Sequence, residues 1–155
     1  MNIKIICLGK TKQDFIKSGI DEYQKRIGRF GKLTWKILPD IKLSGSNTVE
    51  IVKASEAEII RKNLNPRDFI IALDEYGKQF GSIDLTKKLE NISVSGKGIV
   101  FIIGGVYGLD KSIIQQADLR LSFSKLTFTH QMIRLMLSEQ IYRAFTILHN
   151  KKYHY

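Results

Sequence analysis

Two segments in the last third of the chain have residue types suited to holding a small ligand. Residues 102–109, with the sequence IIGGVYGL, form an apolar run that breaks into a glycine loop. Residues 121–130 follow and are rich in hydroxyl side chains, with Phe123, Leu126 and Phe128 between them. Glycine leaves backbone amides open to a ligand. Loops at the carboxyl ends of neighbouring strands form a crevice, so the two segments predict a small-ligand site.

The spacing of these residues argues against the commonest nucleotide and hydrolase motifs. Gly104-Gly105-x-x-Gly108 is not the dinucleotide pattern Gly-x-Gly-x-x-Gly, and no phosphate loop or nucleophile elbow occurs. His130, His149 and His154 lack zinc spacing, so we expect no metal. A plain strand–helix turn remains the alternative explanation of the glycine loop. For residues 122–129 the alternative is an irregular connection into a capped helix.

The chain ends in a basic and aromatic tail, Lys151-Lys152-Tyr153-His154-Tyr155. Such a tail can stack on a nucleobase and contact phosphate, and an imidazole can exchange a proton near neutral pH. Chain ends are normally frayed, and from these residues alone the frayed tail is the favoured interpretation.

The elements that must position these segments can be predicted from hydrophobic periodicity. Strands are expected at residues 2–8, 33–38, 69–73, 99–103 and 118–123. Helices are expected at residues 14–30, 48–63, 110–116, 129–150 (capped by Thr129) and from Ser82 onward. Residues 39–48 and 74–78 are expected to be loops. Strand and helix alternate, which predicts an α/β fold with a mostly parallel sheet and helices on both faces. We expect a single domain over residues 1–155.

Composition and charge indicate the cellular compartment and the kind of binding partner to expect. The chain is 43% hydrophobic and 26% charged, and no apolar run is long enough for a membrane span. Cys7 is its only cysteine, which excludes an internal disulfide, fits a cytoplasmic setting and predicts a buried thiol. The net charge of +10 comes from the two ends, with +6 over residues 1–36 and +5 over residues 120–155. If the ends lie together, they form a basic face for a polyanion; a merely solvated basic surface is the alternative.

The predicted final helix has more apolar residues than one sheet can cover. Only a narrow polar strip remains among Met132, Ile133, Leu135, Met136, Leu137, Ile141, Tyr142, Ala144, Phe145, Ile147 and Leu148. The surplus implies a second partner, and a homodimer is the simplest.

Taken together, these segments resemble the SPOUT class of methyltransferases and, within it, the ribosomal RNA large subunit methyltransferase H family. The resemblance covers essentially the whole chain. Its motifs are Lys4-Ile5-Ile6-Cys7-Leu8-Gly9-Lys10, Glu22-Tyr23-x-x-Arg26, Ile103-Gly104-Gly105-x-x-Gly108-Leu109, Leu121-Ser122-x-Ser124-x-Leu126-Thr127, His130, Arg134, Glu139-Gln140-x-Tyr142-Arg143-Ala144 and Tyr153-His154. It departs from the family at Thr129, where proline is usual, and at Tyr155, where a charged residue is usual.

The resemblance implies a C-terminal trefoil knot and methylation of N3 of a pseudouridine in helix 69 of 23S rRNA, with S-adenosylmethionine as methyl donor. The implied partner is 23S rRNA, either within the assembled ribosome or as free RNA. By position, the cofactor would meet Leu73, Gly104, Gly105, Ser124, Lys125, Leu126, Thr127, Phe128 and Thr129. Tyr153 and His154 would match the tail at the catalytic site. The expected RNA contacts, from the basic ends, are Lys10, Lys12, Lys25, Arg26, Arg29, Arg143, Lys151 and Lys152. A non-catalytic RNA-binding or ribosome-assembly factor on the same fold is the alternative.

Overall fold

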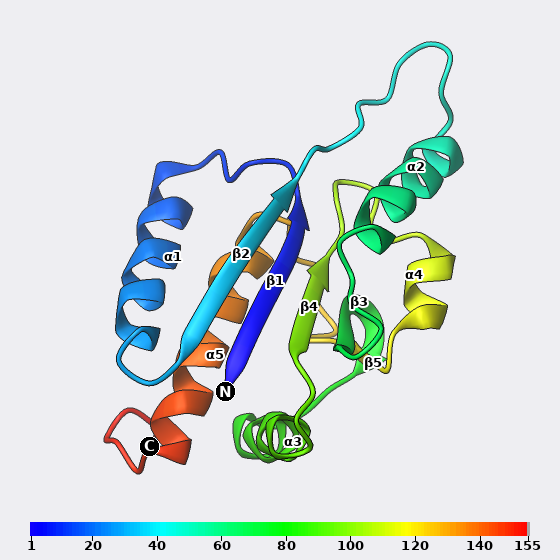
Figure 1. Ribbon diagram of the computed structural model, residues 1–155. Coiled ribbons are helices and arrows are strands. Elements are labelled where there is room, and N and C mark those ends of the chain that lie inside the picture. Colours follow the sequence, from blue (N-terminus) through cyan, green and yellow to red (C-terminus); the bar gives the residue numbers. More distant parts are fainter. Residues whose placement is uncertain (155) are drawn as a thin grey trace.

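The computed structural model describes residues 1–154 and contains one five-stranded sheet, in the order β2-β1-β4-β3-β5 (Figure 1). The strands are β1 (Asn2–Leu8), β2 (Lys32–Leu38), β3 (Phe69–Lys78), β4 (Ile99–Ile103) and β5 (Leu119–Leu121). The helices are α1 (Asp14–Ile27), α2 (Val49–Arg61), α3 (Ser82–Val94), α4 (Lys111–Gln116) and α5 (Met132–Leu148). All neighbouring strands pair in parallel, which confirms the predicted α/β class.

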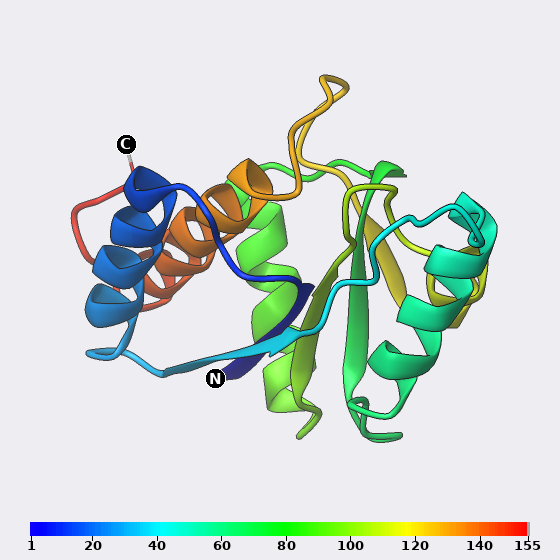
Figure 2. The ribbon, with the colours of Figure 1, turned by 90° about the horizontal axis from the view of Figure 1, so that it is seen from above.

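Helices cover both faces of the sheet because the inner strands are apolar on both sides. All five residues of β4 are buried, as the continuous apolar run predicted. On one face α1, α3 and α5 pack around Phe101, Leu137 and Phe145. On the other face α2 and α4 pack around Ile102 and Ile60 (Figure 2). Cys7 lies wholly buried in the first of these cores, where burial raises the pKa of its thiol.

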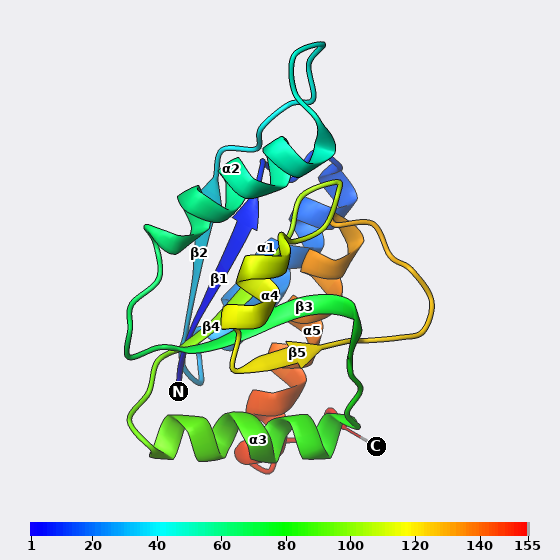
Figure 3. The same cartoon turned by 90° about the vertical axis from the view of Figure 1, so that its right-hand side faces the viewer.

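The parallel arrangement brings the carboxyl ends of the strands to one edge of the sheet, here called the loop edge. Ile3 of β1 lies opposite Ile99 of β4, and Cys7 lies opposite Ile103, so these two strands end together. The loop edge carries residues 9–13 after β1, residues 104–110 after β4 and residues 122–131 after β5. The last of these segments stands out from the body of the molecule (Figure 3).

The prediction of a loop at residues 74–78 is wrong, because β3 continues to Lys78. The edge strand β5 explains the extension. Lys78 pairs with Leu121 beyond an irregularity in the ladder, and Ser122 donates from its backbone N–H to the Lys78 carbonyl at 3.0 Å. Gly77 permits this approach, since a Cβ there would lie 2.7 Å from the backbone of Arg120. The strand expected at residues 118–123 is shorter, at Leu119–Leu121.

The two basic ends of the chain lie side by side, which is the condition for one basic face. Helices α1 and α5 pack against each other on the same face of the sheet (Figure 2). The trefoil knot concerns how the chain is threaded, which the strand order does not test, and it stays a prediction.

Candidate functional site

The glycine loop after β4 is a closed turn whose glycines are required by the loop itself. Gly104 and Gly105 are buried, and Gly108 has a positive φ of 75°. The Gly108 N–H donates to the Gly105 carbonyl at 3.1 Å. A Cβ on Gly104 would lie 2.7 Å from the carbonyl carbon of Gly108, closer than real Cβ contacts. The open side of the loop is therefore Val106 to Gly108, which are exposed.

A buried carboxyl group, not identified from the sequence, supports this loop from behind. Glu56 of α2 is 4% exposed, and a Cβ on Gly105 would lie 3.2 Å from both of its carboxyl oxygens. Its Oε1 accepts from the Ile41 backbone N–H at 3.2 Å. Burial, with a smaller contribution from the charge of Asp40, raises the pKa of Glu56. The sequence contained one indication that Glu56 faces the core. It lies midway between the buried residues Val52 and Ile60, at a spacing of four residues.

The loop after β5 is fixed at its start and exposed beyond it. The buried Ser122 hydroxyl donates to the Ser124 carbonyl at 2.9 Å, and the Ser124 hydroxyl accepts from the Leu126 N–H at 2.9 Å. Lys125, Leu126, Thr127, Phe128 and Thr129 are exposed. As expected, Thr129 caps the entry to α5, where its hydroxyl accepts from the Met132 N–H at 3.1 Å.

Leu73 lies beside these two loops, so the predicted cofactor residues share the loop edge. It is half-buried and pairs with Leu121 of β5. Two residues on, Glu75 accepts a hydrogen bond from the Thr127 hydroxyl at 3.3 Å, which ties the end of β3 to the exposed loop.

The exposed part of the loop after β5 offers backbone donors beside apolar surface. Among residues 1–154, no protein acceptor is found for the backbone N–H groups of Thr127 and Phe128. The side chain of Leu126 is 72% exposed and that of Phe128 is 37% exposed, so apolar surface flanks these free donors. Free backbone donors beside apolar surface suit a flat base with polar edges.

The tail is packed against α5 and α1, contrary to the frayed tail favoured from the residues alone. The Tyr153 hydroxyl donates to Glu139 Oε1 at 3.2 Å and lies 3.4 Å from the Tyr23 hydroxyl. Its ring meets Tyr142 edge-on, with centroids 4.7 Å apart, and the Arg143 guanidinium lies 4.9 Å from its centroid. Burial, with the Tyr23 hydrogen bond and the charge of Glu139, raises the pKa of Tyr153, so the phenol stays protonated.

His154 follows in the same cluster, and its Nδ1 lies 3.3 Å from Nη1 of Arg143. Arg143 also donates to Glu139 through Nε and Nη2, at 3.0 and 2.5 Å. Tyr155 lies outside the described residues.

The structure does not bring the predicted catalytic tail to the predicted cofactor loops of the same chain. Thr129 precedes α5 and Tyr153 follows it, but the tail folds back along the helix, because the Tyr153 hydroxyl donates to Glu139 near its middle. Seven residues of α5, a rise of roughly 10 Å, separate Glu139 from Met132 at the start of the helix. Glu139 and Phe123 nevertheless line the same cavity, so the tail and the start of the loop after β5 approach one space.

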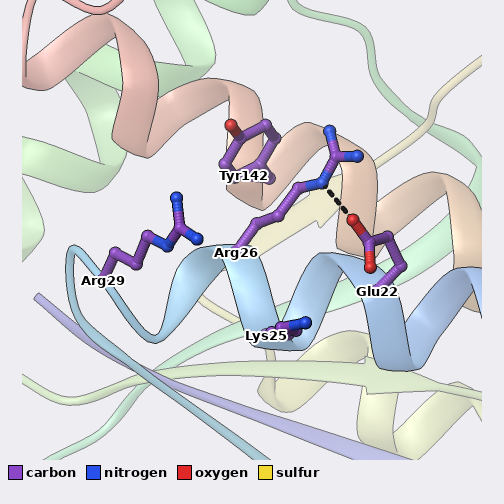
Figure 4. Close-up of a pocket in the computed structure, with 5 residues that line it drawn as sticks. All are labelled: Glu22, Lys25, Arg26, Arg29 and Tyr142. Carbon is purple, nitrogen blue, oxygen red and sulfur yellow. Dashed lines mark hydrogen bonds and ion pairs between the residues drawn. The ribbon is translucent and has the colours of Figure 1, made fainter.

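The predicted RNA contacts fall into two groups. Lys10 and Lys12 are exposed in the segment after β1, at the loop edge. The other six lie near the far end of α1 and α5, and three of them, Lys25, Arg26 and Arg29, line a cavity of about 330 Å³ beside Tyr142 (Figure 4). There Arg26 pairs with Glu22 at 2.7 Å.

A second, more apolar cavity of about 540 Å³ opens between α1, α3 and α5 and reaches the start of the loop after β5. Phe80, Phe123, Met132, Leu135 and Met136 contribute to its lining. These three α5 residues are only half-buried, whereas Leu137 and Ile141 are each 1% exposed and face the core of their own chain. The surplus apolar surface predicted for this helix is therefore present.

No group of three or more histidine, cysteine, aspartate or glutamate side chains is placed to hold a metal ion within residues 1–154. No helix in this part of the chain is long and apolar enough to cross a membrane.

Comparison with known proteins identifies the family. A model of the family described as "Predicted SPOUT methyltransferase" matches residues 1–154. The chain is 43% identical to ribosomal RNA large subunit methyltransferase H of Clostridium botulinum and 46% identical to the protein of that name from Streptococcus suis. Each alignment covers 99% of both chains. The chain therefore belongs to the SPOUT methyltransferase family, and to the group whose curated members bear that name.

A solved structure supports the fold independently. The chain resembles a probable methylase family protein from Haemophilus influenzae Rd KW20, with a TM-score of 0.54 at 15% identity. The match covers 99% of this chain and 70% of the other.

Proposed function

We propose that this protein methylates N3 of a pseudouridine in helix 69 of 23S rRNA, with S-adenosylmethionine as methyl donor. The observation that carries the proposal is the full-length identity of 43% and 46% with two proteins named ribosomal RNA large subunit methyltransferase H. The three predicted cofactor segments support it, because they meet at one edge of a parallel sheet, where open α/β sheets bind their ligands.

The chain's own residues would hold the cofactor through backbone groups. Thr127 and Phe128 offer free N–H donors, the exposed turn Val106 to Gly108 offers further backbone, and Leu73 and Leu126 offer apolar contact. The sulfonium of S-adenosylmethionine supplies an already activated methyl group. The protein then needs to align the acceptor nitrogen with the methyl carbon and the sulfur.

The tail would manage the proton of the imide nitrogen. N3 of a pseudouridine carries a hydrogen and has no free lone pair until that proton leaves, so a base beside it is needed. His154 is the group we assign to this role. Because its pKa is raised, Tyr153 stays a hydrogen-bond donor and would orient a ring carbonyl instead of accepting the proton.

Within residues 1–154 no hydrogen bond joins the tail to the cofactor loops of the same chain, which fits a homodimer with a shared site. In a two-fold dimer built across the half-buried face of α5, each tail can approach the loop edge of the partner. The same arrangement places Lys10 and Lys12 of one chain near the six basic residues of the other, which gives one continuous surface for RNA phosphates. Leu135 and Met136 are the positions that test this interface, since Leu137 and Ile141 belong to the chain's own core.

A mixed dimer tests the shared site. One subunit carries His154→Ala and the other carries Thr127→Pro, which removes a predicted cofactor-binding N–H. Each homodimer should be inactive, whereas the purified heterodimer keeps one intact site and should recover about half of the wild-type kcat. An inactive heterodimer, with both subunits folded, would place the tail and the loops of one site in the same chain.

The chemical assignment has a direct test. Mass spectrometry of 23S rRNA from a strain lacking the gene should show loss of one methyl group on a helix 69 pseudouridine, restored by the wild-type gene. Calorimetry should show binding of S-adenosylmethionine to the purified protein. A protein that binds RNA but not S-adenosylmethionine, in a strain with unchanged methylation, would instead be a non-catalytic assembly factor.

A further inference from the structure

A fully buried arginine joins α5 to the segment after β1. Arg134 is 0% exposed, and its Nη2 donates to the Leu8 carbonyl at 2.6 Å. Its Nη1 donates to the Gly9 carbonyl at 2.9 Å and to the Thr11 hydroxyl at 3.1 Å. Three hydrogen bonds from one side chain thus fix the start of this segment, where Gly9 has a positive φ of 73°.

The residue immediately before α5 holds the next part of the same segment. Gln131 is 5% exposed, and its Oε1 accepts from the Lys12 backbone N–H at 3.0 Å. Its Nε2 donates to the Lys10 carbonyl at 3.2 Å and lies 3.0 Å from Nε2 of His130. Burial and the charges of Arg134 and Lys12 lower the pKa of His130, so its ring is neutral and its Nε2 can accept. Both amide hydrogens and the amide oxygen of the Gln131 side chain therefore make hydrogen bonds.

These contacts connect two parts of the loop edge with different predicted roles. Residues 10–12 carry Lys10 and Lys12, the proposed contacts to RNA phosphates. Gln131 holds the backbone of both lysines, and Arg134 binds the Thr11 hydroxyl between them. Gln131 lies two residues after Thr129, the last of the predicted cofactor contacts. The lysines and the cofactor loop therefore share one rigid anchor, the first turn of α5.

We propose that Gln131 and Arg134 are positioning residues that hold the basic segment 9–12 at a fixed place relative to the cofactor loop. RNA then binds lysines whose backbone is already held in place. The inference rests on the proposed function, because it takes these lysines as RNA contacts. A loop held only by its own residues would leave the lysines free to move, which raises the entropic cost of binding RNA.

Gln131→Met is the sharpest test, because it keeps the volume and the apolar stem of the side chain and removes all three polar contacts. Hydrogen exchange of the Lys12 amide should accelerate about tenfold, while the amides of β4 stay protected. The KM for ribosomal substrate should rise about fivefold, the effect expected from losing one or two neutral hydrogen bonds. The kcat and the affinity for S-adenosylmethionine should stay within about twofold of wild type.

Two further variants separate positioning from stability. Gln131→Glu keeps an acceptor for the Lys12 N–H, so amide exchange at Lys12 should return toward wild type. Gln115→Met, at an exposed position on α4, is the matched control and should change nothing. In a double-mutant cycle, Gln131→Met should add little to the KM of the Lys10→Ala, Lys12→Ala protein, because both changes act on the same contact.

The possible failures are distinguishable. If the two lysine substitutions raise the KM and Gln131→Met does not, the positioning role is wrong and the proposed RNA contact stands. An accelerated Lys12 exchange with an unchanged KM also overturns it, since the contacts would then only stabilise the fold. If the lysine substitutions leave the KM unchanged, these lysines do not bind the RNA and the inference falls with that part of the proposed function.

Discussion

The loop edge and the tail end of this molecule are held by different kinds of contact. At the loop edge, the buried polar side chains Arg134, Gln131 and Glu56 bond to backbone groups of distant segments. At the tail end, half-buried rings and the ion pair of Arg143 with Glu139 hold the last residues to the surface. A buried polar group that loses its partner is costly, whereas a surface ion pair contributes little. Removing a contact at the loop edge should therefore cost more stability than removing one at the tail.

The largest effect should come from the tail, and it should be on activity alone. Replacing His154 with alanine removes the proposed proton acceptor, and general bases typically contribute about 100-fold to 10,000-fold in rate. We expect kcat to fall within that range, with unchanged thermal unfolding and unchanged S-adenosylmethionine affinity. If the His154→Ala protein methylates ribosomes at the wild-type rate, another group must accept the proton.

At the loop edge, Arg134→Met should have the opposite signature, with the main effect on stability. The substitution leaves the Leu8 and Gly9 carbonyls without their donor in a buried site. Each unsatisfied buried group costs roughly 1–3 kcal/mol. Part of this cost is offset, because the substitution also removes a buried guanidinium whose charge is disfavoured by burial, as its lowered pKa indicates. We expect a loss of about 3 kcal/mol in the free energy of unfolding, measured by urea titration. An unchanged urea midpoint would mean that Arg134 does not stabilise the protein. The proposed difference between the loop edge and the tail end would then be wrong.

Tyr153→Phe should have a smaller effect, because the tail is held mainly by packing. The ring and its contact with Tyr142 remain, and the hydrogen bond to Glu139 is lost. We expect kcat to fall about threefold to tenfold, in line with the loss of one hydrogen bond, and no change in unfolding temperature. Glu139→Gln keeps an acceptor for this hydroxyl and should retain more activity than Tyr153→Phe.

The two regions also differ in how far the sequence predicts them. The apolar runs of β1 and β4 predict their own strands, because a strand buried on both faces needs nothing but apolar residues. The end of β3 was predicted to be a loop, since Asp74 to Lys78 are polar and only their pairing beside β5 keeps them extended. Periodicity describes one segment at a time and does not detect such a pairing.

The same limit applies to the candidate site. The glycine loop can be located from its residues, but the approach of Glu56 to Gly105 depends on how α2 crosses the sheet. The docking of Tyr153 depends on Tyr23, which is 130 positions away in the chain. Contacts of this kind arise only when the whole sheet has formed, and their partners carry no local signal.

The smallest predicted effect concerns Glu56, whose raised pKa means that the native state favours its protonated form. The native structure is then favoured below the carboxyl pKa of the unfolded chain, about 4.3, and loses that advantage as pH rises through the higher pKa of the folded state. Glu56→Gln keeps an acceptor for the Ile41 N–H and removes the charge. It should raise the free energy of unfolding at pH 7, with little effect at pH 4.

Glu58→Gln, on the same helix, is the control for Glu56→Gln and should act in the opposite direction. Glu58 is exposed and pairs with Arg61, so its loss should cost a few tenths of a kcal/mol, about the contribution of a helical ion pair. Urea titrations of both variants at the two pH values measure these differences. A destabilised Glu56→Gln protein at pH 7 would mean that the carboxylate is held charged by the glycine loop. The loop edge would then depend on electrostatic attraction to that charge as well as on hydrogen bonds.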